Sequence, residues 1–157
     1  MAKRILLGDD KFAIVDDADY GWLSQYNWQG ANVGYAMRCT LCGCRSNKRI
    51  YMHREIMGFP DGEIDHRNGN KLDNRRCNLR ICTSSQNKAN TKRRRDNTSG
   101  YKGVVFHKAS GKWMAKMARK YLGLFTNVKA AAFAYDEAAF DAFGEFAVLN
   151  FPECSGY

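Results

Sequence analysis

The sequence contains no long apolar run. A helix that crosses a membrane needs about 18 or more consecutive apolar residues, and no stretch of this chain approaches that length. The apolar run nearest the N-terminus is only Ile5–Leu7, which is far too short for the apolar segment of a secretory signal. We therefore expect a soluble, intracellular, cytoplasmic protein with no membrane partner.

Acidic residues are scarce relative to basic ones. The 157-residue chain has 25 Lys or Arg and 16 Asp or Glu, which gives a net charge of +9 and a pI near 9.4. This balance favours a polyanionic partner, usually nucleic acid and less often an acidic membrane. The hydrophobic content of 45% argues against wholesale disorder, and the length suits one ordinary domain or two small ones.

The six cysteines are not expected to form disulfides in an intracellular protein. Cys39 and Cys42 have the spacing of a zinc knuckle, and Cys77 and Cys82 could complete a set of four ligands. Four residues rather than two separate the members of the second pair. We favour half-buried thiols on strands over a structural Zn²⁺ site, and leave open whether Cys39 and Cys42 bind a metal.

A basic segment indicates a boundary between two modules. Residues 88–100 combine a run of cations with turn-forming residues and contain one apolar residue, Ala89. We predict a first module over residues 1–92, a linker over 93–97 and a second module over 98–152. The position of the segment between two modules favours phosphate contacts, rather than a merely solvated face, for Lys92, Arg93 and Arg94.

The second module has the pattern of three strands followed by one helix. Strands are predicted at residues 101–107, 112–117 and 121–125, joined by tight turns. Thr126 or Asn127 is the predicted N-cap of an Ala-rich helix that ends at Gly144. Small residues allow a helix to lie close to a sheet, so we predict a three-stranded antiparallel sheet with one packed helix.

The first module has a polar segment between two short strands. One predicted strand ends at Ile64 and presents Asp65 and His66, and a second covers residues 79–82. Thr83 and Gln86 match a capping box, so a helix should begin there and carry Asn87. The order strand, long polar loop, strand, helix can bring Asp65 and Asn87 together.

Residues 63–90 contain six Asn and an Asp–His pair, which suggests a site for phosphodiester hydrolysis. Asp65 and Asn87 offer oxygen ligands to a hard cation, Mg²⁺ or Mn²⁺, which keeps several waters and takes a substrate phosphate. His66, on the other side of its strand, is a natural general base at neutral pH. The side-chain carbonyl of Asn78 could fix its tautomer. The metal would stabilise the leaving oxyanion, and four arginines could hold phosphates: Arg54, Arg75, Arg76 and Arg80.

These residues resemble the HNH endonucleases, and in particular their homing branch. The resemblance is carried by Met52-His53-Arg54, Ile64-Asp65-His66, Leu72-Asp73-Asn74-Arg75, Asn78-Leu79-Arg80 and Gln86-Asn87, over a core of about residues 50–92. It implies a ββα-metal fold, with His66 as general base, Asp65 and Asn87 as metal ligands, and Asn78 as the residue that orients His66. The family's name calls for His where this chain has Asn87, a substitution seen in the homing branch. His53 recurs in the pattern, as a phosphate contact or as support for the site.

Residues 98–152 resemble the AP2 DNA-binding domain. The matching residues are Tyr101-Lys-Gly-Val104, Gly111-Lys-Trp113, Leu122-Gly-Leu-Phe125 and the Ala-rich helix. In that family the sheet enters the major groove, which implies a DNA-facing set of Lys102, His107, Lys112, Trp113, Lys116, Arg119 and Tyr121. Sheet packing remains the alternative for Trp113 and Tyr121. Plant members carry Arg where this chain has Lys102, Val105 and His107, so a GC-rich target does not carry over.

Together these features predict an α+β protein that is a site-specific, metal-dependent endonuclease of the homing type. The substrate is double-stranded DNA, and the setting is a phage or another mobile element. The alternative is a non-catalytic DNA-binding regulator with a decayed nuclease fold, and a third possibility is an RNA-binding or RNA-processing protein. The sequence leaves open the target site, nicking versus double-strand cutting, and the oligomeric state, for which a monomer is compatible.

Overall fold

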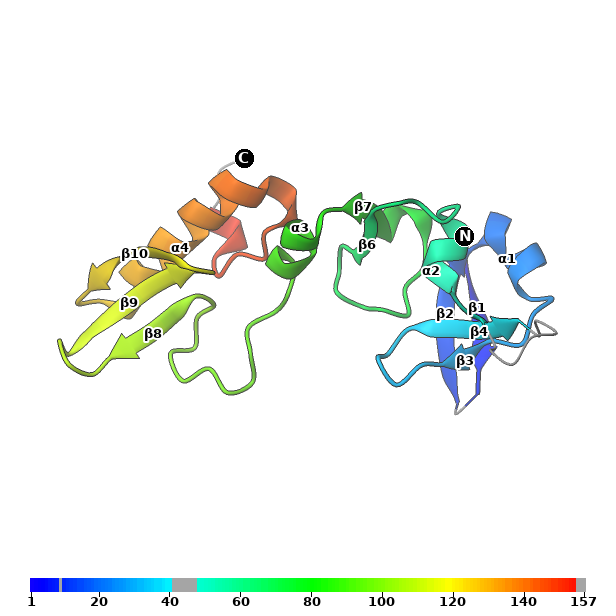
Figure 1. Cartoon of the computed structure of the whole chain (residues 1–157), viewed down its shortest axis with the longest axis horizontal. Coiled ribbons are helices and arrows are strands. Elements are labelled where there is room, and N and C mark those ends of the chain that lie inside the picture. The colour runs from blue at the N-terminus through cyan, green and yellow to red at the C-terminus, as the bar shows by residue number, and fades with distance from the viewer. Residues whose placement is uncertain (9, 41–47, 155–157) are drawn as a thin grey trace. The chain divides into compact units, whose positions relative to one another are not determined.

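The computed structural model describes residues 1–8, 10–40 and 48–154 and forms two compact units, Met1–Ser84 and Ser85–Tyr157 (Figure 1). Both units combine small antiparallel sheets with a few helices, in line with the predicted α+β class. The division falls before the linker predicted at residues 93–97. The helix α3 (Ser84–Ala89) therefore starts at the division and lies almost wholly in the second unit.

Three small sheets build the first unit. The strands β1 (Ala2–Leu7) and β2 (Lys11–Asp16) form an antiparallel hairpin. The strands β3 (Gln29–Gly30), β4 (Ala36–Thr40) and β5 (Lys48–Tyr51) form an antiparallel sheet. A third pair consists of β6 (Glu63–His66) and β7 (Leu79–Cys82). The connecting helices are α1 (Asp17–Leu23), α2 (Met52–Ile56) and the short turn η1 (Arg76–Asn78).

The core of the first unit fixes the position of β6 and β7. Burial alternates along the hairpin, so that Leu7 and Val15 point inward between less buried neighbours. These side chains pack with Leu23 and Met52 from the helices, and with Ile64 of β6 and Leu79 of β7. Ile64 therefore holds the end of β6 in place, and the next two residues of that strand are Asp65 and His66.

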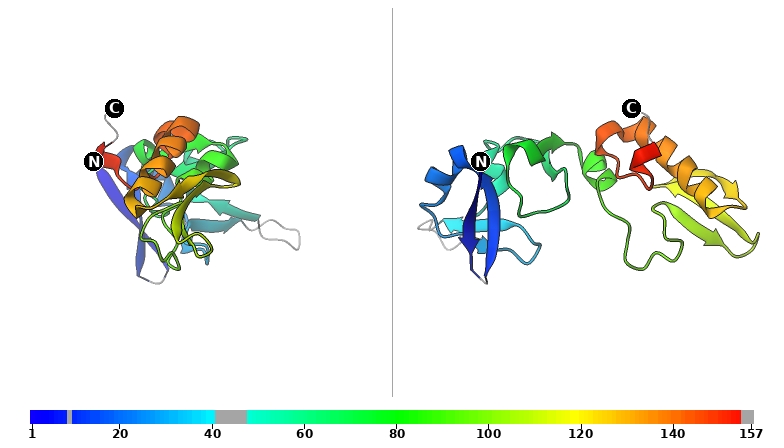
Figure 2. Two further views of the ribbon diagram at one scale, coloured as in Figure 1. Left: turned by 90° about the vertical axis from the view of Figure 1, so that its left-hand side faces the viewer. Right: turned by 180° about the vertical axis from the view of Figure 1, so that it is seen from behind.

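The second unit is a three-stranded sheet covered on one face by a helix. The strands β8 (Val104–His107), β9 (Lys112–Met117) and β10 (Lys120–Phe125) are antiparallel, with β9 in the centre. The helix α4 (Val128–Phe143) begins after Asn127, whose side chain accepts a hydrogen bond from Lys129 N, and ends at Gly144, as the sequence predicted. Figure 2 shows α4 lying along one face of the sheet, where it buries Val104 and Ala115. No helix in the described residues combines the length and the apolar character that a membrane span requires.

The tail after α4 is tied back to the start of the sheet. It contains two short turns, η2 (Gly144–Phe146) and η3 (Pro152–Cys154). The buried carboxylate of Asp136 accepts hydrogen bonds from Asn150 N and Phe151 N at 2.8 Å. Asn150 Oδ1 in turn accepts from Lys102 N at 2.7 Å. These bonds join α4, the tail and the segment before β8 into one unit.

Candidate active site

Asp65 and His66 end the strand β6, and both are 4% exposed. Adjacent residues of a strand point to opposite faces, so the carboxylate and the imidazole lie on different sides of the β6–β7 pair. Two buried polar side chains at one strand end need a chemical or structural partner. The contacts of Asp65 and of His66 identify these partners.

The partner of Asp65 is Arg80, which lies directly opposite it in the β6–β7 register. Arg80 Nε donates to Asp65 Oδ2 at 2.9 Å, and Arg80 Nη2 lies 2.8 Å from the same oxygen. Both side chains are buried. A buried ion pair contributes little more to stability than well-packed apolar residues would. A need for a carboxylate at this position therefore explains the Asp65–Arg80 pair better than a gain in stability does. Arg80 compensates the charge of Asp65, and its predicted contact with phosphate stays a prediction.

The ring of His66 contacts Asn74 instead of the predicted Asn78. His66 Nε2 lies 3.4 Å from Asn74 Oδ1, a long contact that orients the ring. Burial lowers the pKa of His66 below its usual 6.5, while the bond to Asn74 and the carboxylates of Asp65 and Asp73 oppose this shift. The imidazole is therefore neutral at neutral pH, the form that can accept a proton from water.

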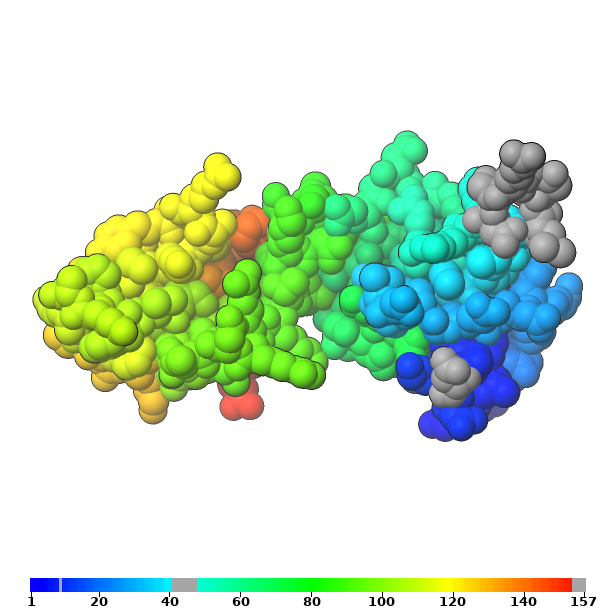
Figure 3. Space-filling view, turned by 60° about the horizontal axis from the view of Figure 1, so that its bottom comes forward, coloured from blue at the N-terminus to red at the C-terminus, as the bar shows by residue number. Residues whose placement is uncertain are grey.

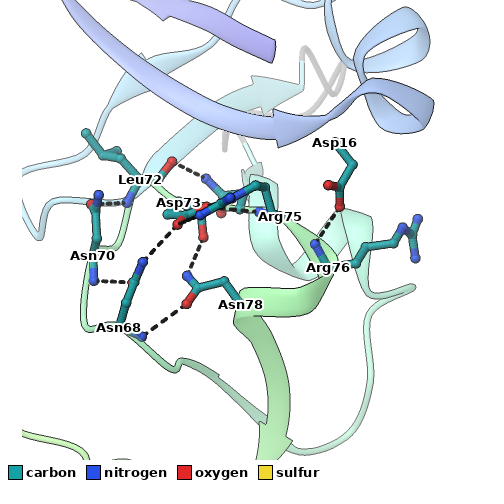
Figure 4. Close-up of polar contacts among 9 residues, drawn as sticks. Asp16, Asn68, Asn70, Leu72, Asp73, Arg75, Arg76 and Asn78 are labelled. Atoms are coloured by element: carbon teal, nitrogen blue, oxygen red, sulfur yellow. Dashed lines mark hydrogen bonds and ion pairs between the residues drawn. The ribbon is translucent and has the colours of Figure 1, made fainter. Parts of the chain in front are cut away.

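Asn78 braces the loop that carries Asn74 (Figure 4). Its Oδ1 accepts from Asn68 N at 3.0 Å, and its Nδ2 donates to Asp73 O at 2.7 Å. Both ends of the Asn78 amide therefore contact the loop, and the direct bond from Asn78 to His66 stays a prediction. The carbonyl of Asp73 belongs to the peptide group that joins Asp73 to Asn74. Asn78 therefore holds the backbone next to Asn74, and Asn74 in turn contacts His66.

Other polar contacts hold the same loop. The Asp73 carboxylate accepts from Arg75 Nε at 2.8 Å and from Asn68 Nδ2 at 2.8 Å, and the bond from Arg75 holds the pKa of this carboxyl below its usual value. Asn74 N donates to Ile14 O of β2 at 2.7 Å. The many Asn residues of this segment therefore replace an apolar core with hydrogen bonds, as Figure 4 shows.

The remaining arginines predicted to contact phosphate also have partners within the first unit. Arg54 donates to Pro60 O at 2.5 Å and to Gly62 O at 3.3 Å, which closes the segment between α2 and β6. Arg76 binds Asp19 of α1 through Nε and Nη2, both at 2.8 Å. The side chains of Arg75 and Arg76 are 38% and 54% exposed, so these two still present cationic surface.

His53 packs against His66 and two tyrosines. Its ring lies 5.3 Å from the His66 ring, 4.9 Å from Tyr35 and 5.7 Å from Tyr51, measured between centroids. Burial first, and then the charges of His66 and Arg54, lower the pKa of His53 to about 3. Its Nδ1 is buried without a hydrogen-bond partner. A neutral, buried ring suits support of the site better than the predicted phosphate contact.

Among the described residues, sequence reasoning missed three that contact the histidines: Asn74, Tyr35 and Tyr51. Asn74 lies within the motif Leu72-Asp73-Asn74-Arg75, but its position along the chain does not distinguish it from Asn78 as a partner of His66. Tyr35 lies within aromatic contact of both His53 and His66. An isolated Tyr before a strand gives no sequence signal for such a role.

The predicted metal ligands fall on both sides of the division between the units. Asp65 belongs to the first unit, whereas Asn87 lies on α3 in the second, so their meeting at one ion stays a prediction. In residues 1–8, 10–40 and 48–154, no group of three or more His, Cys, Asp or Glu could hold a metal. A hard cation that keeps its waters needs only one or two protein oxygens. The carboxylate of Asp65 is an oxygen ligand of this kind, and the binding of a cation by it stays a prediction.

The alternative of a cysteine zinc site stays untested. Cys42 lies outside the described residues. Cys39 and Cys77 are exposed and Cys82 is buried, each as a free thiol.

In the second unit the predicted DNA-facing residues separate into two groups. Lys102 Nζ donates to Ala89 O and Val148 O, and burial lowers its pKa, so its amine has partners within the second unit. Trp113 packs against the core and meets the Phe106 ring edge-on at 5.0 Å. His107 Nδ1 lies 2.8 Å from Ser110 Oγ within a turn. The exposed members of the set are Lys112, Lys116, Arg119 and Tyr121.

The basic segment before β8 is exposed and borders a cavity. Lys92, Arg93 and Arg94 are all exposed. Together with Lys116 of β9 and Val105 of β8, they line a cavity of about 540 Å³. The three cations of this basic segment, which are predicted to contact phosphate, thus lie beside the β8–β9–β10 sheet within the second unit.

Comparison with known proteins relates the chain to a nuclease family. A family model described as HNH endonuclease matches residues 55–89. Over 154 residues the chain is 30% identical to a protein described as an uncharacterized HNH endonuclease of Acanthamoeba polyphaga mimivirus. That match covers 92% of this chain and 79% of the viral protein. No solved structure matches the chain.

Proposed function

We propose a function for this chain from the premise that it belongs to the HNH endonuclease family. The chain is a nuclease by family. Beyond that, we propose that it hydrolyses phosphodiester bonds in double-stranded DNA at a specific site, with a divalent metal and with His66 as the general base. We further propose the homing type, in a phage or another mobile element.

The observation that supports this proposal is that the adjacent residues Asp65 and His66, at the end of β6, are both buried. His66 is neutral and is oriented by Asn74, so its ring can accept a proton from the attacking water. The loop from Asn68 to Asn78 holds Asn74 in place through internal hydrogen bonds. His53 and Tyr35 pack beside the His66 ring and limit its movement.

Asp65, with Asn87 as the second ligand that the sequence predicts, would hold the cation. A bound Mg²⁺ or Mn²⁺ would supply charge stabilisation for the leaving oxygen. Arg80 donates to Asp65 Oδ2 and holds this carboxylate toward its own strand partner. Arg75 and Arg76 present cationic surface on the same unit, where DNA phosphates could bind.

The second unit is proposed as the AP2-type module that binds the target DNA. Its support is the uncovered face of the β8–β9–β10 sheet, on which Lys112, Lys116 and Tyr121 are exposed. Contacts from these cations to phosphate would add affinity, and contacts to base edges would select the site. The basic segment before β8 would follow the DNA backbone.

The proposal is tested by incubating the full chain with supercoiled plasmid and Mg²⁺, with end mapping of the products. Wild-type protein should cleave, EDTA should abolish cleavage, and Asp65→Asn should weaken it while keeping a hydrogen-bond acceptor for Arg80. Asp61→Asn is the matched control, because Asp61 is an exposed acid of the same unit. Binding without cleavage by the wild type would favour the non-catalytic regulator, and preference for RNA in competition would favour the RNA-processing alternative.

A further inference from the structure

One face of the sheet in the second unit carries exposed apolar side chains. The helix α4 covers the opposite face, where Val104 is 1% and Ala115 is 0% exposed. On the uncovered face Val105 is 41% and Leu124 is 37% exposed. In Figure 3 the yellow-green and yellow surface of this sheet faces the viewer, with the orange α4 mostly hidden behind it.

The strand register places these two side chains in one row with the partly buried Met114. Val105 of β8 lies opposite Met114 of β9, and Met114 lies opposite Leu124 of β10. We call Val105, Met114 and Leu124 the apolar row. Adjacent strands are about 4.8 Å apart, so the row spans about 10 Å across the sheet, and none of its side chains has a hydrogen-bond donor or acceptor of ordinary strength.

A bulge in β10 creates this row. The register shifts between Tyr121 and Gly123, so Tyr121 pairs with Lys116 while Leu124 pairs with Met114. Strict alternation would have put Tyr121 and Leu124 on opposite faces, whereas the extra residue brings them to the same face. Lys116 and Tyr121 therefore flank the apolar row on one side, and His107 and Lys112, which pair with each other, flank it on the other.

The charges of the second unit indicate what covers this face. Residues 104–125, which form the sheet and its turns, contain five Lys or Arg and no Asp or Glu. Residues 126–157, which contain α4 and the tail, have one Lys and five Asp or Glu. A basic sheet with an acidic helix behind it is complementary to a polyanion on the sheet side alone. An apolar row between cations therefore suits duplex DNA better than an apolar protein partner.

We propose that Val105, Met114 and Leu124 contact the 5-methyl groups of thymine in the major groove of the target DNA. This inference rests on the proposed function, since it requires that the second unit bind duplex DNA. The thymine methyl is the apolar group that the major groove presents, and the groove is about 12 Å wide, which accommodates a row of about 10 Å. The other base-edge groups would lose hydrogen bonds to water against this row without replacement, which costs free energy. The sheet therefore selects T·A pairs at its centre and uses its flanking lysines for phosphates.

The test uses the full-length chain in EDTA, which holds the DNA uncut while binding is measured. Sites are first selected from a random duplex library, and we expect T·A pairs at the positions the sheet contacts. Each such thymine is then replaced by deoxyuridine, which removes the methyl group and nothing else. Affinity should fall about fourfold for each buried methyl group that is removed, and 5-methylcytosine should bind better than cytosine at the same position.

Variants connect the methyl effect to the apolar row. The double variant Val105→Ala, Leu124→Ala should bind thymine and deoxyuridine duplexes with nearly equal affinity at the positions that these two side chains contact, and should keep the methyl effect at the position that Met114 contacts. Both side chains are exposed, so the variant should fold. Lys112→Ala is the matched control: it removes a flanking charge and should weaken binding to the two duplexes by the same factor.

The outcomes separate this inference from the proposed function. Binding that is equally tight with thymine and deoxyuridine at every selected position would overturn the inference and leave DNA binding intact. Failure of the chain to bind any duplex at low salt would overturn both. Selected sites without thymine at the contacted positions would also overturn the inference, because the apolar row would then have no methyl group to contact.

Discussion

At the scale of single residues, His66 is the group on which the chemistry depends. His66→Ala should reduce the single-turnover cleavage rate by roughly 10²–10⁴-fold, the range for loss of a general base, while DNA affinity changes little. Rates and affinities measured on one oligonucleotide duplex would check this. Near-normal cutting by the variant would remove His66 from the mechanism.

The pH dependence of cleavage should follow the same residue. His66 must be neutral to accept a proton, and burial lowers its pKa below 6.5. The rate should therefore be constant at neutral pH and should fall only as pH drops through that lowered pKa. His53 has a pKa of about 3 and stays neutral throughout this range. A rate profile with its midpoint above 6.5 would contradict this assignment.

A second single-residue prediction concerns packing in the second unit. Gly103 has φ +76, and a Cβ there would lie 1.9 Å from the Tyr135 ring. Gly103→Ala should therefore lower the free energy of unfolding by about 2–5 kcal/mol, through backbone strain and overpacking together. Gly111 has φ +64 with open space around it, so Gly111→Ala should cost only about 1–2 kcal/mol. Urea unfolding of both variants would measure the difference.

At the scale of elements, the loop between β6 and β7 should behave as a unit. Asn78→Ala removes the partners of Asn68 N and Asp73 O, so it should destabilise the first unit by about 1–3 kcal/mol. It should also slow cleavage, because Asn74 is then held less firmly against His66. Asn70→Ala is the control, since Asn70 is exposed and its side chain serves one turn. Equal effects of the two substitutions on the cleavage rate would contradict the indirect role of Asn78.

The same loop should lose stability in acid. The pKa of Asp73 is held below 3.8, first by its hydrogen bond to Arg75. A carboxyl whose folded pKa is lowered contributes stability above its unfolded pKa, and this stability is lost as pH falls through the folded pKa. Asp73→Asn should lower stability at pH 7 and flatten the decline below pH 4, as chemical unfolding at several pH values would show. Asp61→Asn is the matched control, because Asp61 is an exposed acid of the same unit.

At the scale of the whole molecule, two basic units divide catalysis from target binding in our proposal. A fragment ending near Arg95 should still nick DNA at low salt but should lose much of its site preference. Its affinity should fall because tethered modules gain from effective concentration. The slope of log K against log salt should become shallower by about 0.9 for each DNA phosphate that the fragment no longer binds. Binding and cleavage of one substrate library across a salt series would measure both effects, and an unchanged slope and selectivity would remove the second unit as the targeting module.

The sequence by itself determined the features that depend on neighbours along the chain. The start of α3 after Thr83, the Asn127 cap and Gly144 end of α4, and the strands that present Asp65 and His66 all follow from local turn chemistry and periodicity. The motif around Asp65 and His66 was likewise sufficient to indicate the family.

The tertiary structure alone decided which polar groups meet. Asn74 and Asn78 are the same residue type in one loop, and only the fold brings Asn74 to His66. The arginines at positions 54 and 80 are equally suited to phosphate and to internal partners, and the fold gives them internal ones. The bulge in β10 reverses the faces that alternation predicts for Leu124. These outcomes depend on hydrogen bonds and strand registers between segments distant in the chain, and residue spacing carries no information about either.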